Sequence, residues 1–138
     1  MKIRKTFFIG ALAAFAGCDS DVDMRVQVIV PAEVANIPSG VIRVQLFVYD
    51  PMLADAPAML ADMDSVRFSH VNGRTQTFQL LLEADVPGGQ RHYISAEGFE
   101  LTAQCERYVL WDGLTETAAP QVIVMQPVPQ PGCFGRAD

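Results

Sequence analysis

Lysine is nearly absent from this 138-residue sequence, in which no lysine follows Lys2 and Lys5. Removing residues 1–17 takes away three of the ten basic residues and none of the sixteen acidic ones, so the remaining chain has a net charge of −9. Nucleic acid binding needs a basic patch that neutralises phosphates, and attraction to anionic lipid headgroups also needs clustered basic residues. The composition therefore argues against nucleic acid as a partner and against headgroup binding through the folded surface.

The sequence also lacks an apolar run of the roughly 20 residues that cross a bilayer. The N-terminal run TFFIGALAAFAG has 12 residues, follows the basic start MKIRK and precedes a polar segment. A basic start, a short apolar middle and small residues before a polar turn are together typical of a secretory signal peptide, whereas a buried core helix needs none of them. We therefore expect residues 1–17 to be a signal peptide and the protein to be exported.

Cysteine is scarce, with Cys18, Cys105 and Cys133 in the whole chain. The segment FAGC ending at Cys18 resembles the lipobox of bacterial lipoproteins, with Phe15 where that family usually has leucine. The resemblance implies cleavage before Cys18 and lipid on its thiol, which would anchor the chain to a membrane of the bacterial cell envelope, facing the periplasm. The segment AFA, residues 14–16, offers the alternative of ordinary secretory cleavage and a soluble protein.

The number of cysteines bears on this choice. Ordinary cleavage would send three thiols into an oxidising compartment and leave one unpaired. Lipidation consumes Cys18 and leaves Cys105 and Cys133 as a pair, which we expect to form a disulfide. The even remainder favours the lipoprotein.

The chain beyond residue 23 contains no helical stretch of convincing length. Short runs of β-branched and aromatic residues alternate with polar ones and are separated by Pro, Gly and Asn-Gly, which is typical of an antiparallel all-β domain. We expect a two-sheet β-sandwich of about seven to eight strands at 24–128, between an acidic tether at 18–23 and a Pro/Gly-rich tail at 129–138. The predicted strands lie at 24–30, 41–49, 64–71, 75–83, 92–99, 105–111 and 120–128.

Four local patterns give more detail. In VIRVQLFVY, residues 41–49, alternation predicts that Ile42, Val44, Leu46 and Val48 point inward. The dipeptide at residues 72–73, Asn-Gly between alternating runs, predicts a β-hairpin. Residues 50–64 are rich in Ala, Met and Asp and predict an irregular or one-turn helical crossover between the sheets. In the strand at 105–111, alternation predicts Tyr108 and Leu110 on one face and Trp111 on the other.

The segment VQLFVYDPMLADAPAMLADM, residues 44–63, resembles the strand and crossover of YbaY-like and YscW-like bacterial lipoproteins. The later runs TFQLLLEADV, RYVLWDGLTETAAP and VIVMQPV resemble further strands of that family, so the likeness covers roughly residues 26–128. The resemblance implies a small envelope β-sandwich lipoprotein, and some such proteins act as pilotins that help a type III secretion ring assemble. Its most specific motif, residues 54–57, contains Asp55 and Pro57.

Asp55, Pro57 and Trp111 are the candidate residues for binding a partner. A structural role is the alternative for each: Asp55 can accept backbone N–H groups in a turn that Pro57 stiffens, and Trp111 can pack in the core.

Metal binding and catalysis have weaker support. Met52, Met59 and Met63 with His70 could hold Cu(I), but they are not tightly spaced, and methionine commonly fills gaps over a core. We expect neither a metal nor another cofactor.

Two serine–histidine combinations, Ser69 with His70 and Ser95 with His92, lack a glycine elbow and an orienting carboxylate. The carboxylates Glu97, Glu100 and Glu106 are expected to be solvated on exposed sheet faces. We therefore predict that the protein is not an enzyme.

The sequence favours a lipid-anchored envelope β-sandwich that acts as a non-enzymatic binding or assembly factor, pilotin-like in character, with a protein partner. The alternative is a periplasmic lipoprotein that binds a small ligand or a metal.

Overall fold

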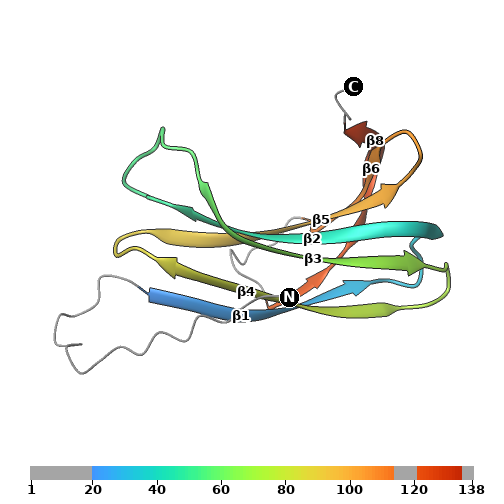
Figure 1. Ribbon diagram of the computed structural model, residues 1–138, viewed down its shortest axis with the longest axis horizontal. Coiled ribbons are helices and arrows are strands. Elements are labelled where there is room, and N and C mark those ends of the chain that lie inside the picture. Colours follow the sequence, from blue (N-terminus) through green and yellow to red (C-terminus); the bar gives the residue numbers. More distant parts are fainter. Residues whose placement is uncertain (1–19, 114–120, 135–138) are drawn as a thin grey trace.

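A computed structural model describes residues 20–113 and 121–134 as eight β-strands in two sheets (Figure 1). The prediction of an all-β, two-sheet sandwich is therefore confirmed. The strands are β1 (Ser20–Val30), β2 (Ile37–Tyr49), β3 (Met59–His70), β4 (Gln76–Val86), β5 (Arg91–Leu101), β6 (Glu106–Trp111), β7 (Val122–Val124) and β8 (Gln126–Phe134). In these two ranges no helix has the length and apolar character needed to cross a membrane. The expected signal peptide, residues 1–17, and Cys18 lie outside the described residues.

The smaller sheet has the strand order β4-β1-β7, and the larger has the order β3-β2-β5-β6-β8. Their facing sides enclose the core because every second residue of a strand points inward. The four residues predicted to point inward from β2 are all buried, as expected. Leu46 of the larger sheet and Leu82 of the smaller one are fully buried, and each such side chain contributes about 1.5–3 kcal/mol through the hydrophobic effect.

The connections differ from the sequence-based expectation at two places. Asn72-Gly73 forms a tight turn, with Gly73 at φ +97°, but it joins β3 of one sheet to β4 of the other, so the predicted hairpin is wrong. The Asn72 side chain donates to the carbonyl of Val34 at 3.1 Å, and its backbone N–H donates to Asn36 Oδ1 at 2.7 Å. These bonds tie the turn to the β1–β2 connection instead of closing a ladder between its flanking strands.

The segment at 50–64, by contrast, was predicted to cross between the sheets and does not. Strand β3 begins at Met59 and pairs antiparallel with β2 in the same sheet, so residues 50–58 form the tip of a hairpin without a helix. The hairpin is therefore at residues 50–58, and the connection between the sheets is at Asn72-Gly73.

The predicted last strand is divided at Met125, which is fully buried and donates its backbone N–H to Ile29 O at 2.9 Å. Before it, β7 pairs parallel with β1; after it, β8 pairs antiparallel with β6 in the other sheet. Strand β8 runs to Phe134, so part of the expected surface tail is an edge strand. Strand β1 begins at Ser20, inside the expected tether.

Candidate functional site

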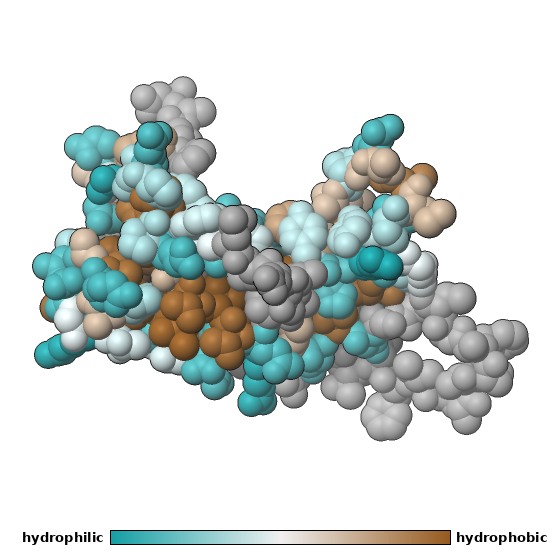
Figure 2. All heavy atoms as spheres, turned by 180° about the vertical axis from the view of Figure 1, so that it is seen from behind, coloured by the Kyte–Doolittle hydropathy of each residue, from teal (hydrophilic) through white to brown (hydrophobic). Residues whose placement is uncertain are grey.

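The side of the larger sheet that faces away from the core is concave. In Figure 1 the β2–β3 hairpin and the β6–β8 edge rise on the same side of the sheet, with β2 and β5 curving between them. Figure 2 shows the same two projections from behind, with a hollow between them. We call this surface the outer face; strand registers and burial assign to it Leu60, Met63, Arg67, Arg43, Gln45, Phe47, Tyr49, Tyr93, Ser95, Glu97, Phe99, Tyr108 and Trp111.

The hairpin end of the outer face exposes large apolar side chains. Met52 and Leu53 at the hairpin tip are 85% and 57% exposed, and Leu60 and Met63 on β3 are 51% and 44% exposed. Met59, at the start of β3, is exposed as well. Isolated exposed apolar residues are normal on soluble proteins, but a group of them on one surface marks an interaction site.

An aromatic cluster lies beside these side chains. The rings of Phe47 and Tyr93 stack with their centroids 5.1 Å apart, and Tyr49 tilts against Tyr93 at 5.9 Å. Phe47 interrupts the polar side of its strand in the sequence, and the structure explains it by this stacking. The stacked rings give the hairpin end a rigid aromatic surface, and aromatic residues are enriched in protein interfaces.

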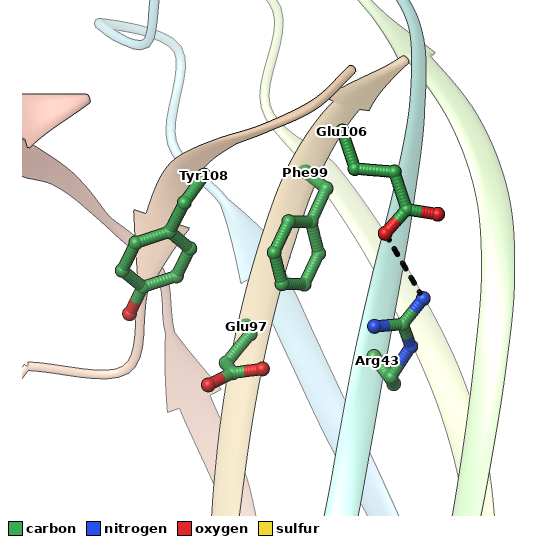
Figure 3. Close-up of a pocket in the computed structure, with 5 residues that line it drawn as sticks. All are labelled: Arg43, Glu97, Phe99, Glu106 and Tyr108. Carbon is green, nitrogen blue, oxygen red and sulfur yellow. Dashed lines mark ion pairs between the residues drawn. The ribbon is translucent and has the colours of Figure 1, made fainter. Parts of the chain in front are cut away.

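The other end of the outer face contains a small cavity of about 270 Å³. Figure 3 shows its five lining residues, which come from β2, β5 and β6: Arg43, Glu97, Phe99, Glu106 and Tyr108.

The guanidinium of Arg43 is held on two sides in this cavity. It lies over the Phe99 ring at 5.0 Å from the centroid, and its Nη2 atom is 3.7 Å from Glu106 Oε2. The Phe99 and Tyr108 rings contact each other with centroids 5.5 Å apart. Phe99 is consequently buried although it points away from the core.

The electrostatic environment of the cavity is visible at Tyr108. Burial, and then the negative charges of Glu97 and Asp112, raise the pKa of the Tyr108 phenol above its ordinary value. Asp112 is itself held in place, because its Oδ2 atom accepts the Ala96 backbone N–H at 3.1 Å. The carboxylates therefore create a negative potential at this end of the outer face.

Trp111 and Tyr108 lie on the same face, which corrects the sequence-based prediction. Tyr108 pairs with Phe99 and Trp111 with Glu97, while Leu110 pairs with Gly98 on the core side. The register shifts between Gly98 and Phe99, so β6 contains one extra residue. Such a bulge reverses the alternation of side chains and brings both aromatic residues to the outer face.

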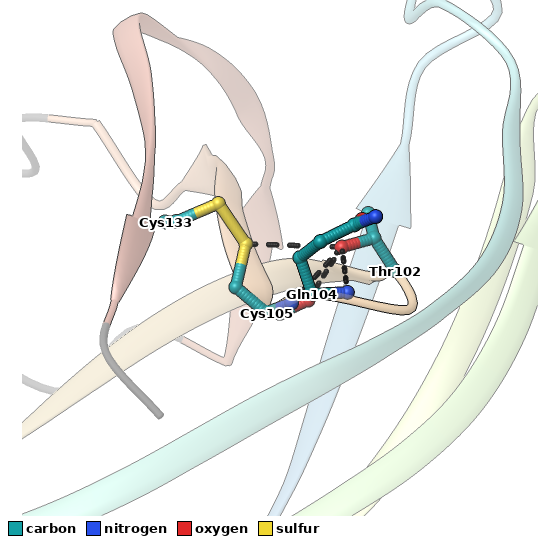
Figure 4. The surroundings of a disulfide bond; sticks show 4 residues. All are labelled: Thr102, Gln104, Cys105 and Cys133. Atoms are coloured by element: carbon teal, nitrogen blue, oxygen red, sulfur yellow. Dashed lines mark hydrogen bonds between the residues drawn. A yellow bond between two sulfur atoms is a disulfide. The ribbon is translucent and has the colours of Figure 1, made fainter. Parts of the chain in front are cut away.

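The disulfide predicted from the cysteine count is present between Cys105 and Cys133, whose Cα atoms are 5.6 Å apart. It joins β8 to the β5–β6 turn, next to Glu106 at the cavity (Figure 4). The Thr102 hydroxyl fixes this turn, since it accepts the Cys105 backbone N–H at 3.1 Å and donates to the Cys105 carbonyl at 3.0 Å. The covalent bond and the turn together hold the β6 side of the cavity.

The remaining partner-binding candidates, Asp55 and Pro57, are exposed at the tip of the β2–β3 hairpin. The carboxylate that stabilises this tip is Asp50, whose Oδ1 atom accepts the Met52 backbone N–H at 2.9 Å. The structure thus leaves Asp55 in solvent and gives the expected capping role to Asp50.

The residues considered for copper binding are not brought together. Met59 and His70 stand at opposite ends of β3, which separates them by about 36 Å at the usual rise per strand residue. His70 is buried, with Nδ1 2.7 Å from Gln76 Oε1 and Nε2 3.1 Å from the Val34 carbonyl oxygen. Its role is to link the β1–β2 connection to β3 and β4.

Neither serine–histidine combination converges. Ser69 is exposed while the adjacent His70 points into the core. Ser95 pairs with Gln45 on the outer face, whereas His92 pairs with the inward-pointing Val48. Alternation along a strand therefore places each serine on the opposite side from its histidine.

Comparison with known proteins gives one likeness to report. No model of a protein family matches the chain, and no curated protein matches it. An alternative pilotin from the type II secretion system of Vibrio cholerae has a similar solved structure, with a TM-score of 0.52 and 20% sequence identity, over 80% of this chain and 100% of that one. At this identity the likeness shows the fold alone, and the resemblance to YbaY-like and YscW-like lipoproteins stays a prediction.

Proposed function

We propose that this chain is a lipid-anchored, non-enzymatic assembly factor of the pilotin type, which binds a secretion-channel protein in the bacterial envelope. The outer face of the larger sheet is the proposed docking surface. The proposal combines an export signal with a lipobox at Cys18, a sandwich fold similar to that of a pilotin, and a concave face with exposed apolar side chains.

The observation that carries the proposal is the composition of the outer face. Leu60 and Met63 are about half exposed, and the stacked rings of Phe47 and Tyr93 lie beside them. An apolar surface of this kind costs free energy in water and is stabilised when a partner covers it. Aromatic residues and methionine are the residue types enriched in such interfaces.

The role as a binding factor also agrees with the distribution of chemical groups. In each of the two serine–histidine combinations considered above, the serine and the histidine lie on opposite faces of their strand, so neither serine can use that histidine as a base. The test is capture of the secretion-channel protein from solubilised membranes by the lipidated chain, compared between outer-face variants and a control variant on the opposite sheet.

A further inference from the structure

The cavity at the β6 end of the outer face has one positively charged lining side chain, and that side chain already has partners. Its single cation, Arg43, is already stacked on Phe99 and paired with Glu106. Arg67 also lies on the outer face but on β3, two strands away from β5, and does not line the cavity. Among the described side chains that line the cavity, Arg43 alone could attract an anionic ligand, and it is already engaged.

Negative charge at the cavity exceeds what Arg43 can balance. Glu97 lines the cavity, and within residues 20–113 and 121–134 it forms no ion pair. The electrostatic effect on Tyr108 shows that both Glu97 and Asp112 act at this place. Among the described side chains that line the cavity, Glu97 and Glu106 face the single guanidinium of Arg43, which leaves one negative charge, and Asp112 adds to it from outside the lining.

The walls of the cavity suit a cation with an apolar stem. Tyr108 lines the cavity, and Trp111 stands beside Glu97 across the β5–β6 ladder. Aromatic rings next to carboxylates attract ammonium and guanidinium groups by their negative faces as well as by charge. The volume of about 270 Å³ is below the roughly 300–1,000 Å³ of ordinary small-molecule sites, and fits a single side chain.

We propose that this cavity receives an arginine or lysine side chain of the partner protein. Its identification as part of a protein partner rests on the proposed function, in which the same face docks a secretion-channel protein. The apolar hairpin end then supplies contact area, and the cavity supplies selection for a basic residue at one position of the docking segment.

The test uses the full-length, lipidated and oxidised chain in an uncharged detergent. Trp111 is the single tryptophan of the sequence, so its fluorescence reports on this region. The probes are N-acetyl-arginine amide and its neutral isostere N-acetyl-citrulline amide, titrated at constant chloride concentration. We expect a saturable change with the arginine probe and a response about fivefold weaker with the citrulline probe.

Two variants locate the effect. Glu97→Gln should weaken arginine binding about fivefold, because it removes the unpaired carboxylate. Asp85→Asn removes a charge from an exposed position in the smaller sheet and should leave binding unchanged. Equal responses to the two probes, no response to the arginine probe, or equal arginine affinity in Glu97→Gln and the native chain would overturn the proposal. The titration needs no partner protein, so its failure is distinct from failure to capture a secretion-channel protein.

Discussion

The carboxylate of Asp64 on β3 accepts the backbone N–H of Leu81 on β4 at 2.9 Å, and so links the two sheets. Two residues earlier, Asp62 accepts the backbone N–H of Glu83 at 2.7 Å. Strand β4 pairs with β1 on its other side, so these bonds fall on its outer edge. Covering an edge in this way satisfies its donors and hinders pairing with other chains.

Removing the Asp64 carboxylate should therefore destabilise the sandwich. Asp64→Ala removes the charged acceptor of the bond between the sheets at Leu81, and we expect a loss of about 1–3 kcal/mol in the free energy of unfolding. Asp64→Asn keeps an oxygen acceptor and should lose less. Urea unfolding of the oxidised protein measures both, with Asp55→Ala at the exposed hairpin tip as a control that changes stability by less than about 0.5 kcal/mol. Equal stability of Asp64→Ala and the control would contradict the edge-covering role.

Asp62 and Asp64 also explain why the sequence predicts a crossover where the structure has the start of strand β3. Aspartate, alanine and methionine have low or moderate β propensity, so residues 59–64 resemble a loop in sequence. The carboxylates of Asp62 and Asp64 have a structural role in β3, because they accept backbone N–H groups from β4 of the other sheet. Local sequence at residues 72–73 likewise specifies a turn, but it does not say which strands will pair after it.

The candidate site shows the same limit of sequence-based prediction. Alternation identified the inward residues of β2 because a regular strand repeats every two residues. The bulge in β6 shifts that repeat by one residue, and no residue in the segment RYVLW predicts a bulge. The cavity joins Arg43, Glu97 and Glu106 from three strands, so only the strand order brings them together. The disulfide was predictable because it depends on a count of cysteines and not on geometry.

Loss of the disulfide should release β8 from the sheet. Three residues of this strand, Pro127, Pro129 and Pro131, have no N–H to donate to β6. The bond closes a loop with a sequence separation of 28, so the double variant Cys105→Ser/Cys133→Ser should lose about 3–4 kcal/mol of stability. Denaturation with and without reductant measures the loss. Reductant should destabilise the native chain and leave the double variant unaffected; two free thiols in the exported protein would contradict this account.

The pKa of Tyr108 gives a prediction at alkaline pH. Because the folded state raises this pKa above the unfolded value, its stabilising effect is complete below the unfolded pKa, and stability falls as pH rises through the folded pKa. Ultraviolet titration of the native chain should show a phenol that ionises above the ordinary tyrosine pKa, and Tyr108→Phe should remove that step.

Glu97→Gln tests the cause of this shift. It should lower the pKa of Tyr108 only part of the way to the ordinary tyrosine value, because burial, the larger cause, and Asp112 remain. Glu33→Gln, in the exposed β1–β2 connection, is the matched control and should leave the titration unchanged. A Glu97→Gln titration identical to that of the native chain would show that this carboxylate does not act on the phenol.

Cys18 should carry the lipid anchor. We expect the native chain to incorporate labelled palmitate and to fractionate with membranes, since several acyl chains at about 0.8 kcal/mol per buried CH₂ give stable attachment. Cys18→Ser should abolish incorporation and release the protein into the soluble fraction. A native chain without label would favour cleavage after residue 16 instead, and a Cys18→Ser protein that stays with the membrane would contradict anchoring through Cys18.

The most direct test of the account is capture of a secretion-channel protein by the outer face. The lipidated chain is affinity-purified from solubilised membranes of its own host, and the channel protein is identified by mass spectrometry. We expect capture by the native chain and by Val122→Glu, which places a charge at an exposed position of the smaller sheet. Leu60→Glu/Met63→Glu should lose at least about tenfold, as expected when charges enter an apolar interface core. Equal capture by all three proteins, or no channel protein with the native chain, would contradict the central claim.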